Sequence, residues 1–150
     1  MGNENINTGV LISLKKKEDE LNYEIWMFKS TCDIFFSGVR PSLFWHNLLV
    51  ESLALHVRVL IDFFYCDRKG ESDDIIAQDL LPSSVSWSEL RPQLPEILRE
   101  AKKKTNKQLA HLSSSRIDLK KQGEKDWRIL DIYNKMNDII ERFYKIKRCE

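Results

Sequence analysis

Apolar residues recur along this chain at spacings of three, four and seven, the pattern of helices that bury one side. No segment shows the sustained polar–apolar alternation that predicts strands. Gly38 followed by Pro41 predicts a helix end, and Pro95 suits the first position of a new helix. The pattern therefore predicts long helices over about 15–37, 42–65, 95–112 and 124–148.

The second segment is the most apolar, with large hydrophobic residues around most of its circumference. A helix of this kind is typical of the middle of a structure, so we expect the other helices to surround it. The remaining segments each carry one apolar stripe. On the first helix the stripe consists of Leu14, Leu21, Ile25, Phe28, Cys32 and Phe35.

Two polar connections separate these helices. The first, between the second and third helices, contains a short apolar run that predicts a helix from Ile75 to Leu80, with Asp73 or Asp74 as its cap. The second begins at Ser113. We therefore predict an all-α, four-helix bundle with a short extra helix in the connection between helices 2 and 3. Residues 1–150 form a single domain with a flexible N-terminus over about residues 1–13.

Composition fits this fold: 42% of the 150 residues are hydrophobic and 31% are charged, as in globular proteins. No apolar run reaches the roughly 18 residues that cross a bilayer, and no signal peptide is recognisable, so we expect a cytoplasmic protein without membrane association. The three cysteines are far apart, and the histidines lack metal-ligand spacing. We therefore expect no disulfide framework, no metal and no cofactor.

Charge is distributed unevenly along the chain. Residues 1–98 carry a net charge of about −6 and residues 99–150 about +7, although the whole chain is only +1. The basic C-terminal third could attract a polyanion such as RNA. Alternatively, two acidic and two basic helices attract each other within one bundle.

The segment from Lys104 to His111 is where residue types suggest chemistry. A histidine near the end of a helix and among lysines could act as a general acid or base in RNA cleavage. Asn106, with Lys104, Lys107 and Arg116, could hold phosphate. Alternatively, His111 caps the carbonyl groups of its own helix or fills a half-buried position.

This segment resembles the signature of the HEPN superfamily, small all-α proteins often found in bacterial toxin and phage-defence systems. Their signature is an arginine and a histidine separated by four to six residues. The arginine is commonly followed by a polar residue. His111 takes the place of the histidine and Asn106 that of the polar residue, while Thr105 or Lys104 stands where the arginine belongs. Lysine does not provide the planar bidentate fork of arginine. The resemblance implies a composite dimer site in active members and binding or dimerisation in inactive ones.

The polar residues of the second helix and the tryptophans could each be structural or functional. Glu51, Arg58 and Asp62 share one side of the second helix and could line a polar pocket, or form an ion pair that fixes helix register. His56 lies in line with apolar residues, so we expect its ring in the core. The tryptophans fall on apolar stripes and predict core packing, except that Trp87, in the irregular connection, could contact a partner or ligand.

Three functions compete on these observations. The sequence favours a dimeric, HEPN-like binding or regulatory module that pairs with itself or with a protein partner, and that could be directed at RNA. The alternative is a metal-independent ribonuclease that uses His111 in a composite dimer site. A weaker third possibility is a small-molecule or nucleotide sensor built on Glu51, Arg58 and Asp62.

Overall fold

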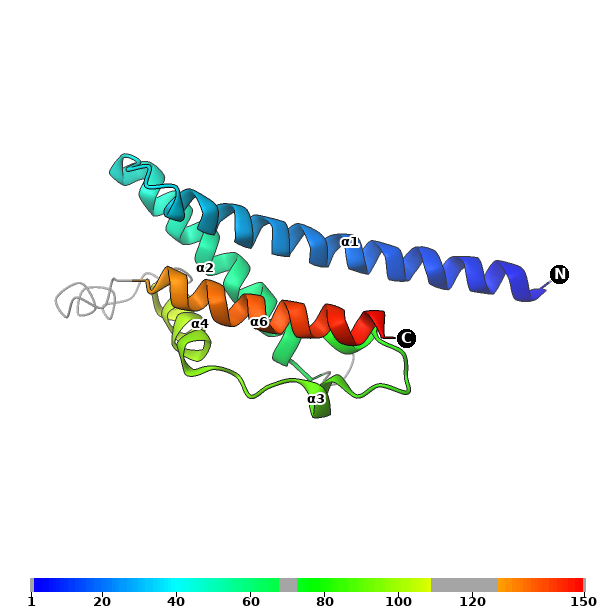
Figure 1. Cartoon of the computed structure of the whole chain (residues 1–150). Helices are drawn as coiled ribbons and strands as arrows, with labels where there is room; N and C mark the ends of the chain where they lie inside the picture. The colour runs from blue at the N-terminus through cyan, green and yellow to red at the C-terminus, as the bar shows by residue number, and fades with distance from the viewer. Residues whose placement is uncertain (1, 68–72, 109–126, 150) are drawn as a thin grey trace.

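The computed structural model describes residues 2–67, 73–108 and 127–149, with side chains for residues 8–67, 73–106 and 127–149. Over these residues the chain is all-helical and contains no strand (Figure 1). This confirms the predicted all-α class.

The first helix, α1, spans Gly2–Phe36. It begins well before the predicted start near Lys15 because no proline interrupts these residues, while the flexibility predicted for about residues 1–13 stays a prediction. The helix is followed by Gly38, whose φ of 76° lies in the left-handed region that glycine adopts without steric cost. The expected stripe is confirmed at its centre, where Phe28 and Cys32 are fully buried.

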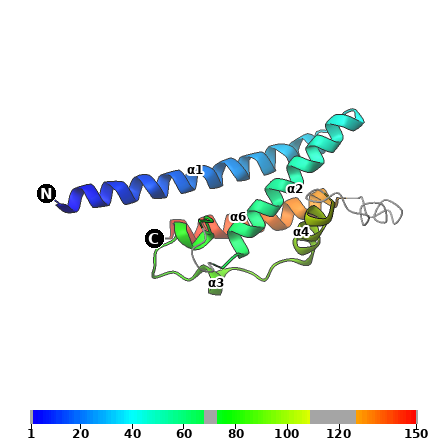
Figure 2. The ribbon, with the colours of Figure 1, turned by 180° about the vertical axis from the view of Figure 1, so that it is seen from behind.

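The second helix, α2, spans Leu43–Tyr65 and runs back along α1. Its buried residues all lie from Leu53 onward, whereas Phe44 and Trp45 are 66% and 59% exposed. The expectation that other helices surround α2 is therefore wrong for its N-terminal half. The reason is geometric: the end of the α1–α2 hairpin lies away from the helices that cover the rest of α2 (Figures 1 and 2).

The connection after α2 contains two short elements, the 3₁₀ helix η1 (Ala77–Leu80) and the helix α3 (Trp87–Leu90). The predicted short helix is thus a 3₁₀ turn, and its capping carboxylate is Asp79, which accepts a hydrogen bond from the backbone N–H of Ile76 at 3.2 Å. Trp87 is 2% exposed, and its Nε1–H donates to the carbonyl oxygen of Phe64 at 2.7 Å. The idea that Trp87 contacts a ligand is wrong, because its indole belongs to the core.

The remaining long helices are α4 (Glu96–Gln108) and α6 (Ile129–Arg148). Ion pairs join them to the acidic part of the chain: Lys102 of α4 contacts Asp62 of α2, and Lys147 of α6 contacts Glu18 of α1. These contacts agree with the interpretation that acidic and basic helices attract each other within one fold. They are partly exposed, so each contributes about 0–1 kcal/mol.

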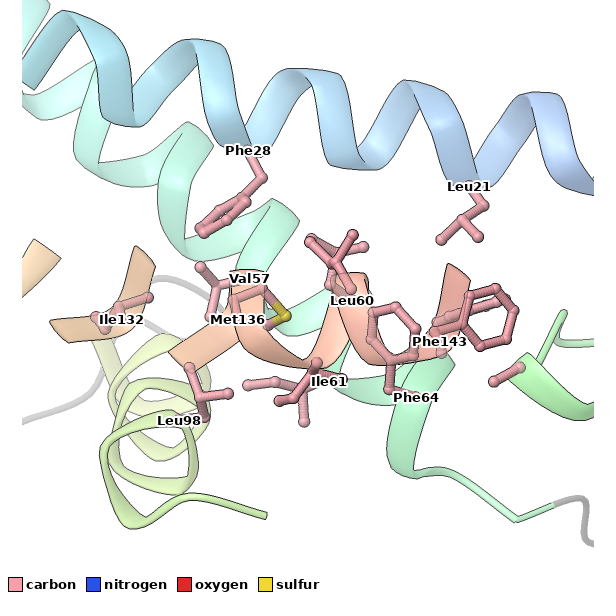
Figure 3. Close-up of a cluster of buried hydrophobic side chains, with 14 of the residues drawn as sticks. Leu21, Phe28, Val57, Leu60, Ile61, Phe64, Leu98, Ile132, Met136 and Phe143 are labelled. Carbon is pink, nitrogen blue, oxygen red and sulfur yellow. The ribbon is translucent and has the colours of Figure 1, made fainter. Parts of the chain in front are cut away.

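One apolar core joins all these elements (Figure 3). Burial raises the pKa of the Cys32 thiol to about 12, with the neighbouring Asp33 carboxylate adding to the effect, so this cysteine behaves as a small hydrophobic residue. The fully buried large side chains come from α1, α2, α4 and α6, and they are Phe28, Leu53, Val57, Leu60, Ile61, Phe64, Leu98, Ile132, Met136, Ile139 and Phe143.

Candidate functional site

Residues 104–108, the described part of the segment that ends at His111, form the C-terminal end of α4. Thr105, which stands in the place of the arginine, is 4% exposed. Its hydroxyl donates to the carbonyl oxygen of Ala101 at 2.9 Å and lies 3.4 Å from that of Ala54 in α2. A short hydroxyl that is hydrogen-bonded to its own helix and buried against α2 cannot neutralise a phosphate.

The other residues of this segment are only partly placed. Lys104 lies with its Nζ atom 5.6 Å from the centre of the Trp127 ring, a cation–π contact. Asn106 is half-buried, and its Oδ1 atom is buried without a hydrogen-bond partner in the part of the chain that the structure describes. Lys107 belongs to α4, but its side chain lies outside the described residues, as do His111 and Arg116.

Two of the polar residues of α2, Arg58 and Asp62, form an ion pair. Asp62 Oδ2 lies 3.8 Å from Nε of Arg58, and the other carboxylate oxygen of Asp62 contacts Lys102 of α4. Glu51 lies before Arg58 in α2, towards the N-terminal end of the helix, and is exposed. Asp62 thus joins α2 to α4. The four-residue spacing within α2 predicted the contact between Asp62 and Arg58. It could not predict the contact between Asp62 and Lys102, because these residues are distant in sequence.

His56 is buried, as its position on the apolar side of α2 predicted, with 5% exposure. Its Nδ1 atom lies 2.6 Å from Oε2 of Glu24 in α1. A carboxylate can only accept, so Nδ1 carries the proton of this hydrogen bond. The ring of Tyr23 approaches the imidazole edge-on at 6.1 Å. This pair connects α1 and α2 through polar side chains, and sequence analysis did not identify Glu24.

A cleft of about 650 Å³ lies beside this pair, between α1, α2 and the connection before η1. Its apolar wall includes Leu21, Leu60 and Phe63, and it carries more carboxylates than cations. This composition favours positively charged groups. Among the described residues, however, no three His, Cys, Asp or Glu side chains gather closely enough to hold a metal ion. The carboxylates that line the cleft are Glu20, Glu24, Asp62, Asp73 and Asp74.

The most unusual feature of the described surface is the side of α1 and α2 that faces away from the core. Trp26 is 60% exposed and Leu55 is 54% exposed, although most large apolar side chains elsewhere are buried. The expectation that Trp26 and Trp45 pack in the core is therefore wrong. We call this surface the outer face of the α1–α2 pair. It consists of Ile12, Tyr23, Trp26, Ile34, Phe44, Trp45, Leu48, Leu55 and Val59.

Helix geometry explains how sequence analysis missed this surface. On α2, Leu48 and Leu55 are seven residues apart and therefore share a side, whereas the buried Leu53 and Leu60 share the opposite side. Both sides carry large apolar residues, although Glu51, Arg58 and Asp62 also lie on the side of Leu48 and Leu55. The sequence therefore shows that α2 has two surfaces with apolar residues to cover. It does not show that the chain covers only one of them.

Comparisons of the chain with protein-family models, with curated proteins and with solved structures find no match. Among the described helices, none is long and apolar enough to span a membrane.

The contact between Glu24 and His56 gives a stability prediction. Glu24→Ala leaves the buried Nδ1–H of His56 without its acceptor, so the free energy of unfolding should fall by about 1–3 kcal/mol in urea denaturation. Glu24→Gln keeps an acceptor oxygen and should recover part of this loss. Glu20→Ala, an exposed position one turn earlier, is the matched control and should stay within about 0.5 kcal/mol of wild type. Equal small effects of both alanine variants would contradict a structural role for the pair.

Proposed function

We propose that this chain is a HEPN-like four-helix bundle that acts as a homodimeric binding or regulatory module in the cytoplasm. The observation that carries the proposal is the outer face of the α1–α2 pair. Exposed apolar patches larger than a few hundred Å² mark interaction sites in soluble proteins. The side chains of the outer face are about half exposed. Because an aromatic side chain alone can bury about 150–250 Å², together they leave on the order of 900 Å² uncovered. A stable interface buries about 800 Å² per partner.

Several features favour a second copy of the chain as the occupant. Most dimers of one chain pair the same surface on both copies, so an exposed apolar surface can complement itself. The chain has a net charge of only +1, which gives two copies little mutual repulsion. Aromatic residues such as Tyr23 and Trp26 are also enriched at interfaces.

Binding is favoured over catalysis at the HEPN-like segment because the arginine is missing. Thr105 in its place is buried and hydrogen-bonded within α4, and Lys104 packs on the Trp127 ring. RNA remains the proposed target because the last third of the chain is basic, with a net charge of about +7 over residues 99–150. The setting in a toxin or defence system rests on the family resemblance alone.

An RNA assay separates binding from cleavage. The purified protein, mixed with a single-stranded RNA in the presence of a chelator, should retain the RNA in a salt-dependent complex and leave it intact on a denaturing gel. The matched comparison is His111→Ala. RNA cleavage that this substitution abolishes, with unchanged thermal melting, would instead establish the metal-independent ribonuclease. A protein that neither binds nor cleaves the RNA would remove RNA from the proposal and leave protein association.

The role of the outer face can be tested with two exposed leucines. Leu55→Lys places a charge on the outer face, so it should weaken the dimer by at least tenfold in dissociation constant, measured by light scattering after size exclusion. Leu130 of α6 is similarly exposed, at 59%, but lies outside the outer face. Leu130→Lys should leave the dimer unchanged. If both substitutions had the same effect, the assignment of the interface to the α1–α2 pair would be wrong.

A further inference from the structure

Three of the exposed apolar residues of α1 have a regular spacing. Ile12 and Ile34 lie eleven residues before and after Tyr23, and all three are exposed. Eleven residues make about three turns of an α-helix, with an offset of about 20°, so the three side chains follow one line along the helix. The buried Phe28 and Cys32 lie on the opposite side of α1. This line is therefore symmetric about Tyr23.

The N-terminal part of α1 extends beyond the other described elements. In Figures 1 and 2 the helix continues past the C-terminal end of α6 without another element beside it. Val10, Leu11 and Ile12 in this part are each more than half exposed. The opposite end of α1, near Ile34, lies in the hairpin and is backed by α2. The apolar side chains near Ile12 are therefore exposed on a helix without a neighbouring described element, whereas Ile34 lies where α1 packs on α2.

We infer that two copies of the chain pair through antiparallel α1 helices, with the two-fold axis at Tyr23. This inference rests on the proposed homodimer and specifies its geometry. In this arrangement Ile12 of each copy packs against Ile34 of the second copy, and the two Tyr23 side chains meet at the axis. The extended part of α1 is then covered by the hairpin of the other copy, while Leu55 and Leu48 of α2 border the contact.

The polar residues on the same side of α1 are compatible with this register. Two residues of the two copies face each other when they lie equally far before and after Tyr23 in the sequence. Every charged residue on the line therefore meets an uncharged one, and no like charges oppose each other. The pairs are Lys16 with Ser30 and Asp19 with Met27.

Disulfide trapping tests the register directly. The background is Cys66→Ser with Cys149→Ser, which removes the exposed thiols and keeps the buried Cys32. Facing Cα atoms of two packed helices lie about 4–6 Å apart, which suits a disulfide. Tyr23→Cys alone should therefore give a covalent dimer under mild oxidation. Two copies of Ile12→Cys, or two of Ile34→Cys, keep their thiols about 33 Å apart and should not be linked.

The decisive sample is a mixture of the Ile12→Cys and Ile34→Cys proteins, which should form covalent dimers that neither protein forms alone. Linkage of either single variant to itself at the rate of the mixture would overturn the antiparallel register. A chain that is dimeric in solution but shows no linkage in the mixture would overturn this inference and leave the proposed homodimer standing. A monomeric chain would remove both.

Discussion

The contact between α1 and α2 is the constraint on which the rest of the structure depends. Phe28 and Cys32 of α1 and Leu53 and Leu60 of α2 are fully buried in the core. Each fully buried large side chain contributes about 1.5–3 kcal/mol relative to exposure, so these contacts outweigh the ion pairs at the surface. The hydrogen bond between Glu24 and His56 fixes how α1 and α2 align, because it forms only when these two residues lie opposite each other. Helices α4 and α6 then pack on the hairpin that these contacts form.

The same contact leaves the opposite side of the hairpin uncovered. An α-helix that is apolar on most sides needs neighbours on most sides, but the described part of the chain buries side chains of α2 only from Leu53 onward. Exposing this much aromatic surface is unfavourable in water. Association of two copies removes that cost without any change within the chain, and this is the physical basis of the proposed function.

The sequence predicted much of the fold because its main features are local. The spacing of Leu21, Phe28 and Cys32 indicated the buried side of α1, and Gly38 indicated its end; both are confirmed. The burial of His56 followed from its place among apolar residues. The sequence did not predict the exposure of Trp26 and Trp45, because periodicity identifies a side that must be covered but not the molecule that covers it.

The candidate site was harder to predict for a related reason. Glu24 and His56, like Asp62 and Lys102, come together only through tertiary packing, so no spacing in the sequence connects them. Thr105 is buried on the core side of α4, and its burial there weakens the case for phosphate binding at that position. His111 and Arg116 lie outside the described residues, and their proposed roles stay predictions.

The mass of the unmodified chain in solution tests the central claim most directly. Sedimentation equilibrium over a range of concentrations should give a mass that rises to twice that of the 17.7 kDa chain and then remains constant, as expected for a closed two-fold dimer. A mass of one chain at every concentration up to the solubility limit would contradict the account, because the outer face of the α1–α2 pair would then be stable in water without a second copy.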